Sequence, residues 1–175
     1  MKTHTSPLQK IKKNQIKELL DKLALYHGCS TEHLKSKFFY RTNKGKVYIS
    51  GHNINLNEEN KLSKVEGPYF DRLNSIGMYF GTYHDDLRFR LSIEGTQLIK
   101  PTKNFILLKD ENALRAYISA ENIVKEEVEI FDHSNFCPFL IVRYGSKNLG
   151  SVSPKDGIYL NYVPKSRKLE HSKVF

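Results

Sequence analysis

Apolar and polar residues alternate with different periods along this chain. After Ser6-Pro7, apolar residues recur at the spacing of one helix face, which predicts a helix that ends near Tyr26 with Gly28 as its C-terminal stop. The apolar positions are Leu8, Ile11, Ile16, Leu19, Leu20 and Leu23. Lysines fill the polar side of this stripe, and a solvated helix face is the usual explanation of such a pattern.

The pattern then changes to the period of strands. Residues 37–42 and 46–50 are aromatic and β-branched runs separated by a turn at Asn43-Lys44-Gly45, which predicts a β-hairpin. Gly67-Pro68 opens a segment with the spacing of a short helix through Ile76. Residues 78–83 and 87–93 flank a turn at His84-Asp85-Asp86. The second run alternates apolar residues with Arg88 and Arg90, which predicts a strand with two guanidinium groups on one face.

The second half of the chain contains more short strands. A break near Pro101 marks the expected boundary between domains of residues 1–95 and 96–175. Beyond it we expect a short helix at 111–118 and strands at 105–109, 128–131, 139–144 and 157–163. Several short strands with little helix favour a small closed or nearly closed β-barrel. The predicted class is therefore α+β, an N-terminal α/β domain with an antiparallel sheet followed by a barrel.

The charge of the chain is basic and unevenly distributed. It has 175 residues, 39% of them hydrophobic, which is enough for a core, and a formal net charge of +9. Residues 96–163 are balanced, so the positive surplus of the second half comes from residues 164–175. That tail contains Lys165, Arg167, Lys168 and Lys173 against Glu170. Composition alone leaves two interpretations equally open, a phosphate-binding surface and a solvated tail.

Other residues of the tail favour a tethered segment. Val163, Leu169 and Val174 are placed to anchor it to the domain, and less ordering entropy is then lost on binding. Tyr144, Tyr159 and Tyr162 lie nearby and are able to stack on unpaired bases, although packing against strands is the more common role of such tyrosines.

No sequence motif predicts catalysis, a metal site or a cofactor site. The chain lacks HExxH, CxxC, GxSxG and a glycine-rich phosphate loop. The residues His84-Asp85-Asp86 are expected to form a turn rather than a metal site. Cys29 lies near His27 without an orienting third group, and Cys137 is expected to be a small buried hydrophobe. The two cysteines indicate a reducing compartment, and no apolar run is long enough for a membrane span.

The order of the segments resembles the Nip7 family of ribosome-biogenesis factors over nearly the whole chain. The resemblance rests on "IKELLDKLALYHG", "FFYRTNKGKVYIS", "SIGMYFGTYHDDLRFRLSI", "LIKPTKNFILLK", "ISAENIVKEEV" and "FLIVRYGSKNLGSVS". Its most specific block contains Gly77, Phe80, Gly81, Phe89, Arg90 and Leu91.

This resemblance implies a C-terminal PUA domain, a mixed β-barrel that binds RNA. It implies a non-catalytic factor in pre-rRNA processing and large-subunit assembly, with ribosome-assembly proteins or the RNA exosome as partners. Basic residues late in the domain would bind single-stranded, uridine-rich RNA. They correspond here to Lys165, Arg167, Lys168 and Lys173, with Arg143 and Lys147 as lesser candidates. One position departs from the family pattern, because Ala120 replaces the glycine usual in the loop after the first PUA helix.

We therefore expect a monomeric RNA-binding adaptor without cofactor or metal, cytoplasmic, or nucleolar if the source has a nucleus. Two other hypotheses remain. A small RNA-modifying enzyme would use Asp85 or Asp86 as acid or base and would place them in a pocket. A protein-interaction module would have no affinity for RNA, and its basic tail would keep it soluble or dock an acidic partner.

Overall fold

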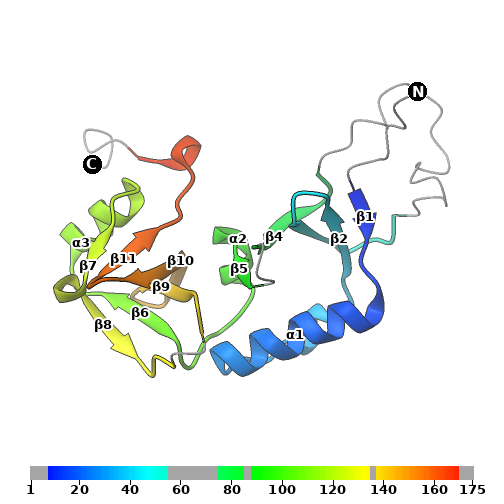
Figure 1. The fold of residues 1–175 in the computed structure, drawn as a ribbon, viewed down its shortest axis with the longest axis horizontal. Coiled ribbons are helices and arrows are strands. Elements are labelled where there is room, and N and C mark those ends of the chain that lie inside the picture. Colours follow the sequence, from blue (N-terminus) through cyan, green and yellow to red (C-terminus); the bar gives the residue numbers. More distant parts are fainter. Residues whose placement is uncertain (1–7, 55–74, 85–87, 135–136, 170–175) are drawn as a thin grey trace.

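The computed structural model describes residues 8–54, 75–84, 88–134 and 137–169. They form a mixed α+β structure in which two sheets lie side by side and a long helix, α1, runs along one edge of the molecule (Figure 1). None of the helices in these ranges combines the length and the apolar character that a membrane span requires.

The first sheet is antiparallel, with the strand order β1-β2-β3-β4-β5. Its strands are β1 (Leu8–Lys10), β2 (Phe38–Thr42), β3 (Lys46–Ser50), β4 (Met78–Tyr83) and β5 (Phe89–Leu91). The predicted hairpin is confirmed as β2 and β3, in which Phe39 pairs with Ile49 and Arg41 with Val47. A short 3-10 helix, η1 (Glu32–Leu34), precedes the hairpin.

Helix α1 (Lys13–His27) packs its apolar face against this sheet. Leu19, Leu20 and Leu23 lie in one core with side chains from β2, β3 and β4, among them Phe39 and Phe80. The predicted C-terminal stop is confirmed, because Gly28 has φ 59° and its backbone N–H donates to the Ala24 carbonyl.

The predicted start of this helix was wrong. Leu8 to Lys10 form β1, which pairs with Tyr40 to Thr42, and the helix begins only at Lys13. Leu8 is completely buried as part of the first strand of the sheet. Its spacing from Ile16 suits a helix face, but pairing with β2 satisfies the backbone of this segment and buries Leu8 as well, so tertiary contact decides its conformation.

The strand predicted for residues 87–93 is shorter than expected. β5 ends at Leu91, and a short helix, α2 (Ile93–Gln97), begins after Ser92. The Ser92 side chain caps this helix by accepting from the Gly95 backbone N–H at 2.9 Å. Residues 85–87, and residues 67–74 of the other predicted short helix, lie outside the described residues.

The second sheet has six strands in the order β7-β11-β10-β9-β6-β8 and curls into a half-barrel. It is mixed, because β6 and β9 are parallel and the other pairs are antiparallel. Its strands are β6 (Phe105–Leu108), β7 (Ile123–Val124), β8 (Val128–Phe131), β9 (Leu140–Tyr144), β10 (Lys147–Lys155) and β11 (Ile158–Asn161). Helix α3 (Glu111–Ile118) and the 3-10 helices η3 (Lys125–Glu127) and η4 (Lys165–Arg167) complete it. The predicted strands β6, β8, β9 and β11 and the predicted helix are confirmed.

The longest strand of this sheet, β10, was not predicted. Its residues include Gly150, two serines and Pro154, which are poor strand formers. The register shifts between Asn148 and Gly150 where β10 pairs with β9, as at a β-bulge. Pairing with β9 on one side and β11 on the other therefore makes this segment a strand.

The segment between the two sheets is bound to the end of α1. The Thr102 N–H donates to the His27 carbonyl at 2.9 Å, and Asn104 Nδ2 donates to the Tyr26 carbonyl. Phe105 and Ile141 of the second sheet belong to the core under α1. The division into domains of 1–95 and 96–175 stays a prediction, and these contacts show that the two parts share packing.

Candidate nucleic-acid interface

A cleft of about 250 Å³ opens where the first sheet meets the segment that follows β11. This segment, which includes η4, is the red part of the ribbon in Figure 1. The charged and aromatic residues that line the cleft are Lys46, Tyr79, Arg90, Glu94, Tyr117, Tyr162 and Arg167. The cleft is thus built from both halves of the chain and carries three cationic side chains and one carboxylate.

Two arginines of the first half contact aromatic rings of the second half. Arg90 lies in β5, and Arg88 is the residue just before this strand. The Arg90 guanidinium lies 4.1 Å from the centre of the Tyr162 ring, and the Arg88 guanidinium lies 5.7 Å from the centre of the Phe139 ring. Tyr162 and Phe139 contact each other edge to face, with ring centres 5.9 Å apart. Since Arg90 and Tyr162 both line the cleft, one wall presents a planar cation against an aromatic ring.

Lys46 and Tyr79 line the cleft from the face of the first sheet that points away from α1. Lys46 Nζ lies 6.0 Å from the centre of the Tyr79 ring, and Tyr79 contacts Tyr48 at 5.6 Å between ring centres. Both tyrosines are partly exposed and Lys46 is exposed. Partly exposed tyrosines beside lysine are the groups that bind single-stranded nucleic acid by stacking and charge.

The basic tail predicted from the sequence is tethered beside this cleft. Val163 packs against the second core, and the Leu169 N–H donates to the Ile118 carbonyl at 3.1 Å. The Leu169 carbonyl accepts from the Ser119 hydroxyl at 3.1 Å. The side chains of Lys165 and Lys168 are exposed. Two other residues of the predicted tail, Lys173 and Val174, lie outside the described residues.

Arg167 is paired with a carboxylate of the first half of the chain. Its Nη1 binds Glu94 Oε1 in α2. Burial disfavours the charged Glu94 carboxylate, but hydrogen bonds from its own backbone N–H and from Arg167 outweigh burial and lower the pKa of Glu94. The side chain of Arg167 remains half exposed, so the pair holds the tail against α2 and still presents the guanidinium to the cleft.

Arg143 and Lys147 do not lie with the tail. They line a different cleft of about 620 Å³ together with Lys100, next to the C-terminal end of α2. The Arg143 guanidinium lies 4.8 Å from the centre of the Phe105 ring, which packs within the protein. The predicted site residues that the structure describes therefore divide into a tail group and a second group beyond α2.

The three tyrosines proposed for stacking have different environments. Tyr159 is buried in the second core, and Tyr144 packs against that core. Only Tyr162 of the three lines the cleft. Tyr117 also lines it and has no hydrogen-bond partner for its hydroxyl among the described residues, and burial raises its pKa.

The sequence predictions missed Lys46, Tyr79 and Arg90 as site residues. Arg90 carried a signal, because the alternating run of residues 87–93 placed it on the polar face of a strand. Lys46 and Tyr79 lie far from the tail in sequence and come close to it only because β3 and β4 line the same cleft as η4.

The described residues contain no group of three or more His, Cys, Asp or Glu side chains that would hold a metal ion. Asp85 and Asp86 lie outside the described residues. Burial raises the pKa of the Cys29 thiol and raises that of Cys137 to about 11, so neither is an activated nucleophile. Both cysteines are buried and unpaired, and Cys137 is the small buried hydrophobe that was predicted.

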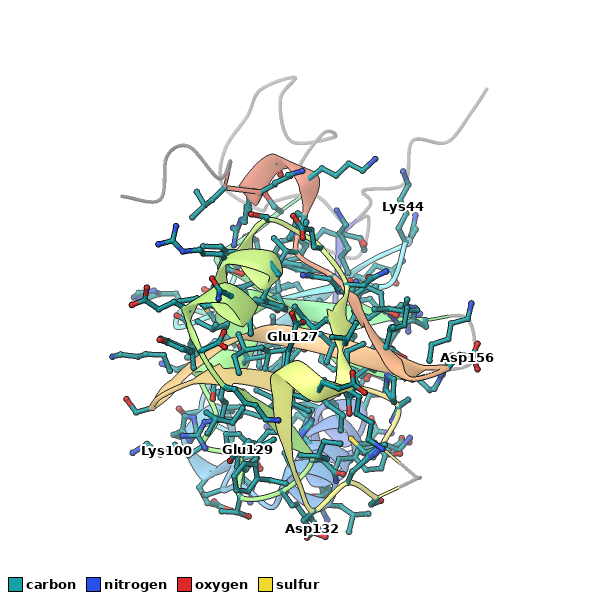
Figure 2. All side chains as sticks on the ribbon, turned by 90° about the vertical axis from the view of Figure 1, so that its left-hand side faces the viewer. Lys44, Lys100, Glu127, Glu129, Asp132 and Asp156 are labelled. Carbon is teal, nitrogen blue, oxygen red and sulfur yellow. The ribbon has the colours of Figure 1, made fainter. Side chains whose placement is uncertain are left out.

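Several carboxylates of the second sheet lie on another part of the surface. Figure 2 shows Glu127, Glu129 and Asp132 along η3, β8 and the residues after it, on the end of the molecule formed by this sheet. The exposed lysines Lys109 and Lys125 lie among these carboxylates. Since the tail follows β11 and contacts α2, the basic tail and this group of carboxylates occupy different parts of the surface.

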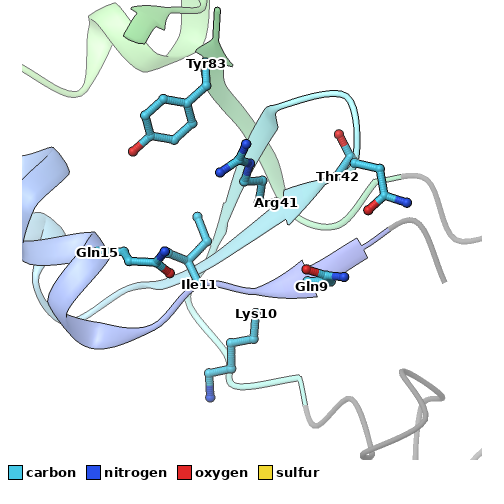
Figure 3. Close-up of a pocket in the computed structure, with 8 residues that line it drawn as sticks. Gln9, Lys10, Ile11, Gln15, Arg41, Thr42 and Tyr83 are labelled. Atoms are coloured by element: carbon cyan, nitrogen blue, oxygen red, sulfur yellow. The ribbon is translucent and has the colours of Figure 1, made fainter. Parts of the chain in front are cut away.

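A further hollow of about 310 Å³ lies at the edge of the first sheet (Figure 3). Arg41 lines it, with its guanidinium 5.1 Å from the centre of the Tyr83 ring. Gln9 and Gln15 also line it, and its described lining includes no carboxylate or thiol. This hollow therefore offers hydrogen-bonding groups and cations, without a carboxylate or a thiol for acid–base or nucleophilic catalysis.

Comparison of the chain with protein-family models and with curated proteins finds no match.

Proposed function

We propose that this protein is a non-catalytic RNA-binding adaptor that holds single-stranded RNA in the cleft between its two halves. One observation carries the proposal: the tethered basic tail lies beside a cleft lined by Arg90, Tyr162 and Tyr79. The phosphate contacts would come from Lys165, Arg167, Lys168 and Lys173. Tyr162 and Tyr79 would stack on unpaired bases.

The more specific assignment is a Nip7-type factor of ribosome biogenesis with a C-terminal PUA domain, acting with ribosome-assembly proteins or the RNA exosome. The mixed, curled second sheet supports this proposal. So does Ala120, which has φ 60° in the loop after α3, the left-handed conformation that favours the glycine of the family pattern. Arg143 and Lys147 would belong to a secondary contact, since they line a separate cleft.

The test is fluorescence anisotropy with a labelled single-stranded uridine-rich oligomer over a salt series. We compare the wild type with Lys165→Glu/Arg167→Glu/Lys168→Glu. The matched control is Lys109→Glu/Lys125→Glu/Lys155→Glu, which makes the same change in net charge on exposed lysines of the second half.

We expect the wild type to bind with a steep salt dependence. For single strands, each lost phosphate contact lowers the slope of log K against log salt by about 0.7, so the tail variant should lose roughly 2 units of slope while the control stays close to wild type. An equal loss of salt slope in the tail variant and the control would mean that the effect comes from net charge alone and not from the tail. The absence of binding by the wild type would refute the RNA proposal and favour a protein-interaction module.

A further inference from the structure

Lysines surround an apolar groove on the first half of the molecule. The groove has a volume of about 550 Å³ and lies between the start of α1 and the segment that leads into β2. Its floor consists of Ile11, Ile16, Leu20, Phe38 and Phe39. Leu20 and Phe39 are buried, while Ile11, Ile16 and Phe38 are only partly covered. The floor is thus an extension of the core that reaches the surface.

Five lysines form the rim. Lys13 and Lys17 come from α1, Lys35 and Lys37 come from the segment between η1 and β2, and Lys10 comes from β1. In Figure 3 the Lys10 side chain extends away from Arg41, and its Nζ lies 5.2 Å from the centre of the Phe38 ring. Cations therefore stand on both walls of the groove.

The described residues neutralise only part of this charge. Lys35 is paired with Glu32, and Lys10 donates to Asn53 Oδ1 at 2.6 Å. Within the described ranges, Lys13, Lys17 and Lys37 have no ion pair with a carboxylate.

The position of these lysines on α1 is also unfavourable. The first turn of α1 contains no acidic residue, so its lysines oppose the positive end of the helix dipole. Lys13 and Lys17 repel each other at i, i+4 spacing. An acidic ligand would relieve both of these unfavourable interactions.

We infer that this groove docks an acidic amphipathic helix of a partner protein. An apolar groove receives the apolar face of such a helix through residues at i, i+3, i+4 and i+7. Glutamates or aspartates on the flanks of the helix would meet the lysines on both walls, which favours association and selects the partner. The inference concerns a surface separate from the RNA cleft and does not depend on RNA binding.

The composition of the floor distinguishes this ligand from a nucleic acid. Isoleucine and leucine side chains offer no flat aromatic surface for bases, and Lys10 lies over the ring of Phe38, the partly exposed aromatic residue of the floor. Phosphates alone would use the lysines and leave the apolar floor in contact with water. A helix with an apolar face covers both parts of the groove.

The test uses a peptide of about 14 residues with leucines at helix-face spacing and glutamates on both flanks as the probe. A scrambled peptide of the same composition and a peptide with glutamines in place of the glutamates are the controls. Binding to the full-length protein is measured by fluorescence anisotropy, and the site is mapped by amide NMR shifts of the labelled chain. The protein variants are Lys13→Glu/Lys17→Glu/Lys37→Glu and the charge-matched Lys44→Glu/Lys125→Glu/Lys155→Glu.

We expect the amphipathic acidic peptide to bind more tightly than both control peptides, with shifts concentrated at Ile11, Ile16 and Phe38. The groove variant should bind it roughly tenfold more weakly, and the matched variant should bind like the wild type. Equal binding of the scrambled peptide, or equal binding by the groove variant, would overturn the inference. Groove shifts produced by a uridine-rich RNA but not by the peptide would make the groove a nucleic-acid surface instead.

Discussion

The guanidinium of Arg90 lies 4.1 Å from the centre of the Tyr162 ring. Arg90 belongs to β5 of the first sheet, and Tyr162 follows β11 of the second, so this contact joins the two halves of the chain at the cleft. Arg90 Nε also donates to His84 Nε2 at 3.4 Å. These contacts hold the guanidinium in place before any ligand binds, which reduces the entropy lost on binding.

Tyr162 provides a test of stacking. Replacing Tyr162 by alanine removes the ring, and we expect RNA affinity to fall by on the order of tenfold, since one base–aromatic stack contributes about 1–3 kcal/mol. Tyr162→Phe keeps the ring and should retain nearly wild-type affinity in the anisotropy titration. Thermal unfolding of both variants shows whether the fold is kept. Equal RNA affinity of Tyr162→Ala and the wild type would exclude stacking on this residue.

Glu94 provides a test of charge in the same cleft. Glu94→Gln removes the carboxylate that pairs with Arg167, so phosphate no longer competes with this carboxylate for the guanidinium. We expect RNA binding to tighten severalfold, with a salt slope close to that of the wild type because the number of phosphate contacts is unchanged. Glu129→Gln makes the same charge change at an exposed position of β8 and is the control. Weaker binding by Glu94→Gln would mean that the pair is needed to position the tail.

His27 makes stability dependent on pH. Burial lowers the pKa of His27 from 6.5 to about 4, and a hydrogen bond with the Asn104 backbone opposes this shift only in part. Between these two values the unfolded chain binds a proton that the folded protein does not, so stability falls as the pH drops through this range. The full loss is about 3 kcal/mol.

Urea denaturation of the wild type and of His27→Gln near neutral pH and near the acidic end of this range measures the effect. The variant should lose less stability than the wild type on acidification, since it lacks the titrating group. The exposed His52 supplies a control as His52→Gln, for which the wild-type pH dependence should persist. The same pH dependence in wild type and His27→Gln would assign the acid sensitivity to other groups.

Gly28 tests the junction between α1 and the connecting segment. Gly28 has φ 59°, and a Cβ at this position would overlap Thr102 Oγ1, which donates to the Gly28 carbonyl at 2.8 Å. Gly145 has φ 56° with nothing within 4 Å of its added Cβ. Gly145→Ala should therefore cost about 1 kcal/mol from backbone strain alone.

Gly28→Ala should cost roughly 1–3 kcal/mol more than Gly145→Ala, because overlap with Thr102 adds to the strain. Chemical denaturation of the two variants gives this difference directly. Equal losses would show that the connecting segment moves aside freely and does not hold the end of α1.

The local pattern of residues was sufficient to predict those elements that are specified by their own residues. The hairpin of β2 and β3 follows from two strand-forming runs around a turn, and the end of α1 follows from Gly28. The α+β class was predictable for the same reason. The basic tail was also found from the sequence, because the number of charged residues in a segment can be counted without knowing the fold.

Contacts between segments distant in sequence determined the other elements and the arrangement of the candidate interface. Leu8 to Lys10 became a strand by pairing with β2, and β10 formed between two neighbours despite Gly150 and Pro154. The candidate interface exists because β3, β4 and β5 meet the segment after β11. Arg143 is separated from the tail because α2 lies between them. Spacing along a chain encodes helix and strand periods, whereas the partners of a side chain across a cleft depend on packing among segments far apart in sequence.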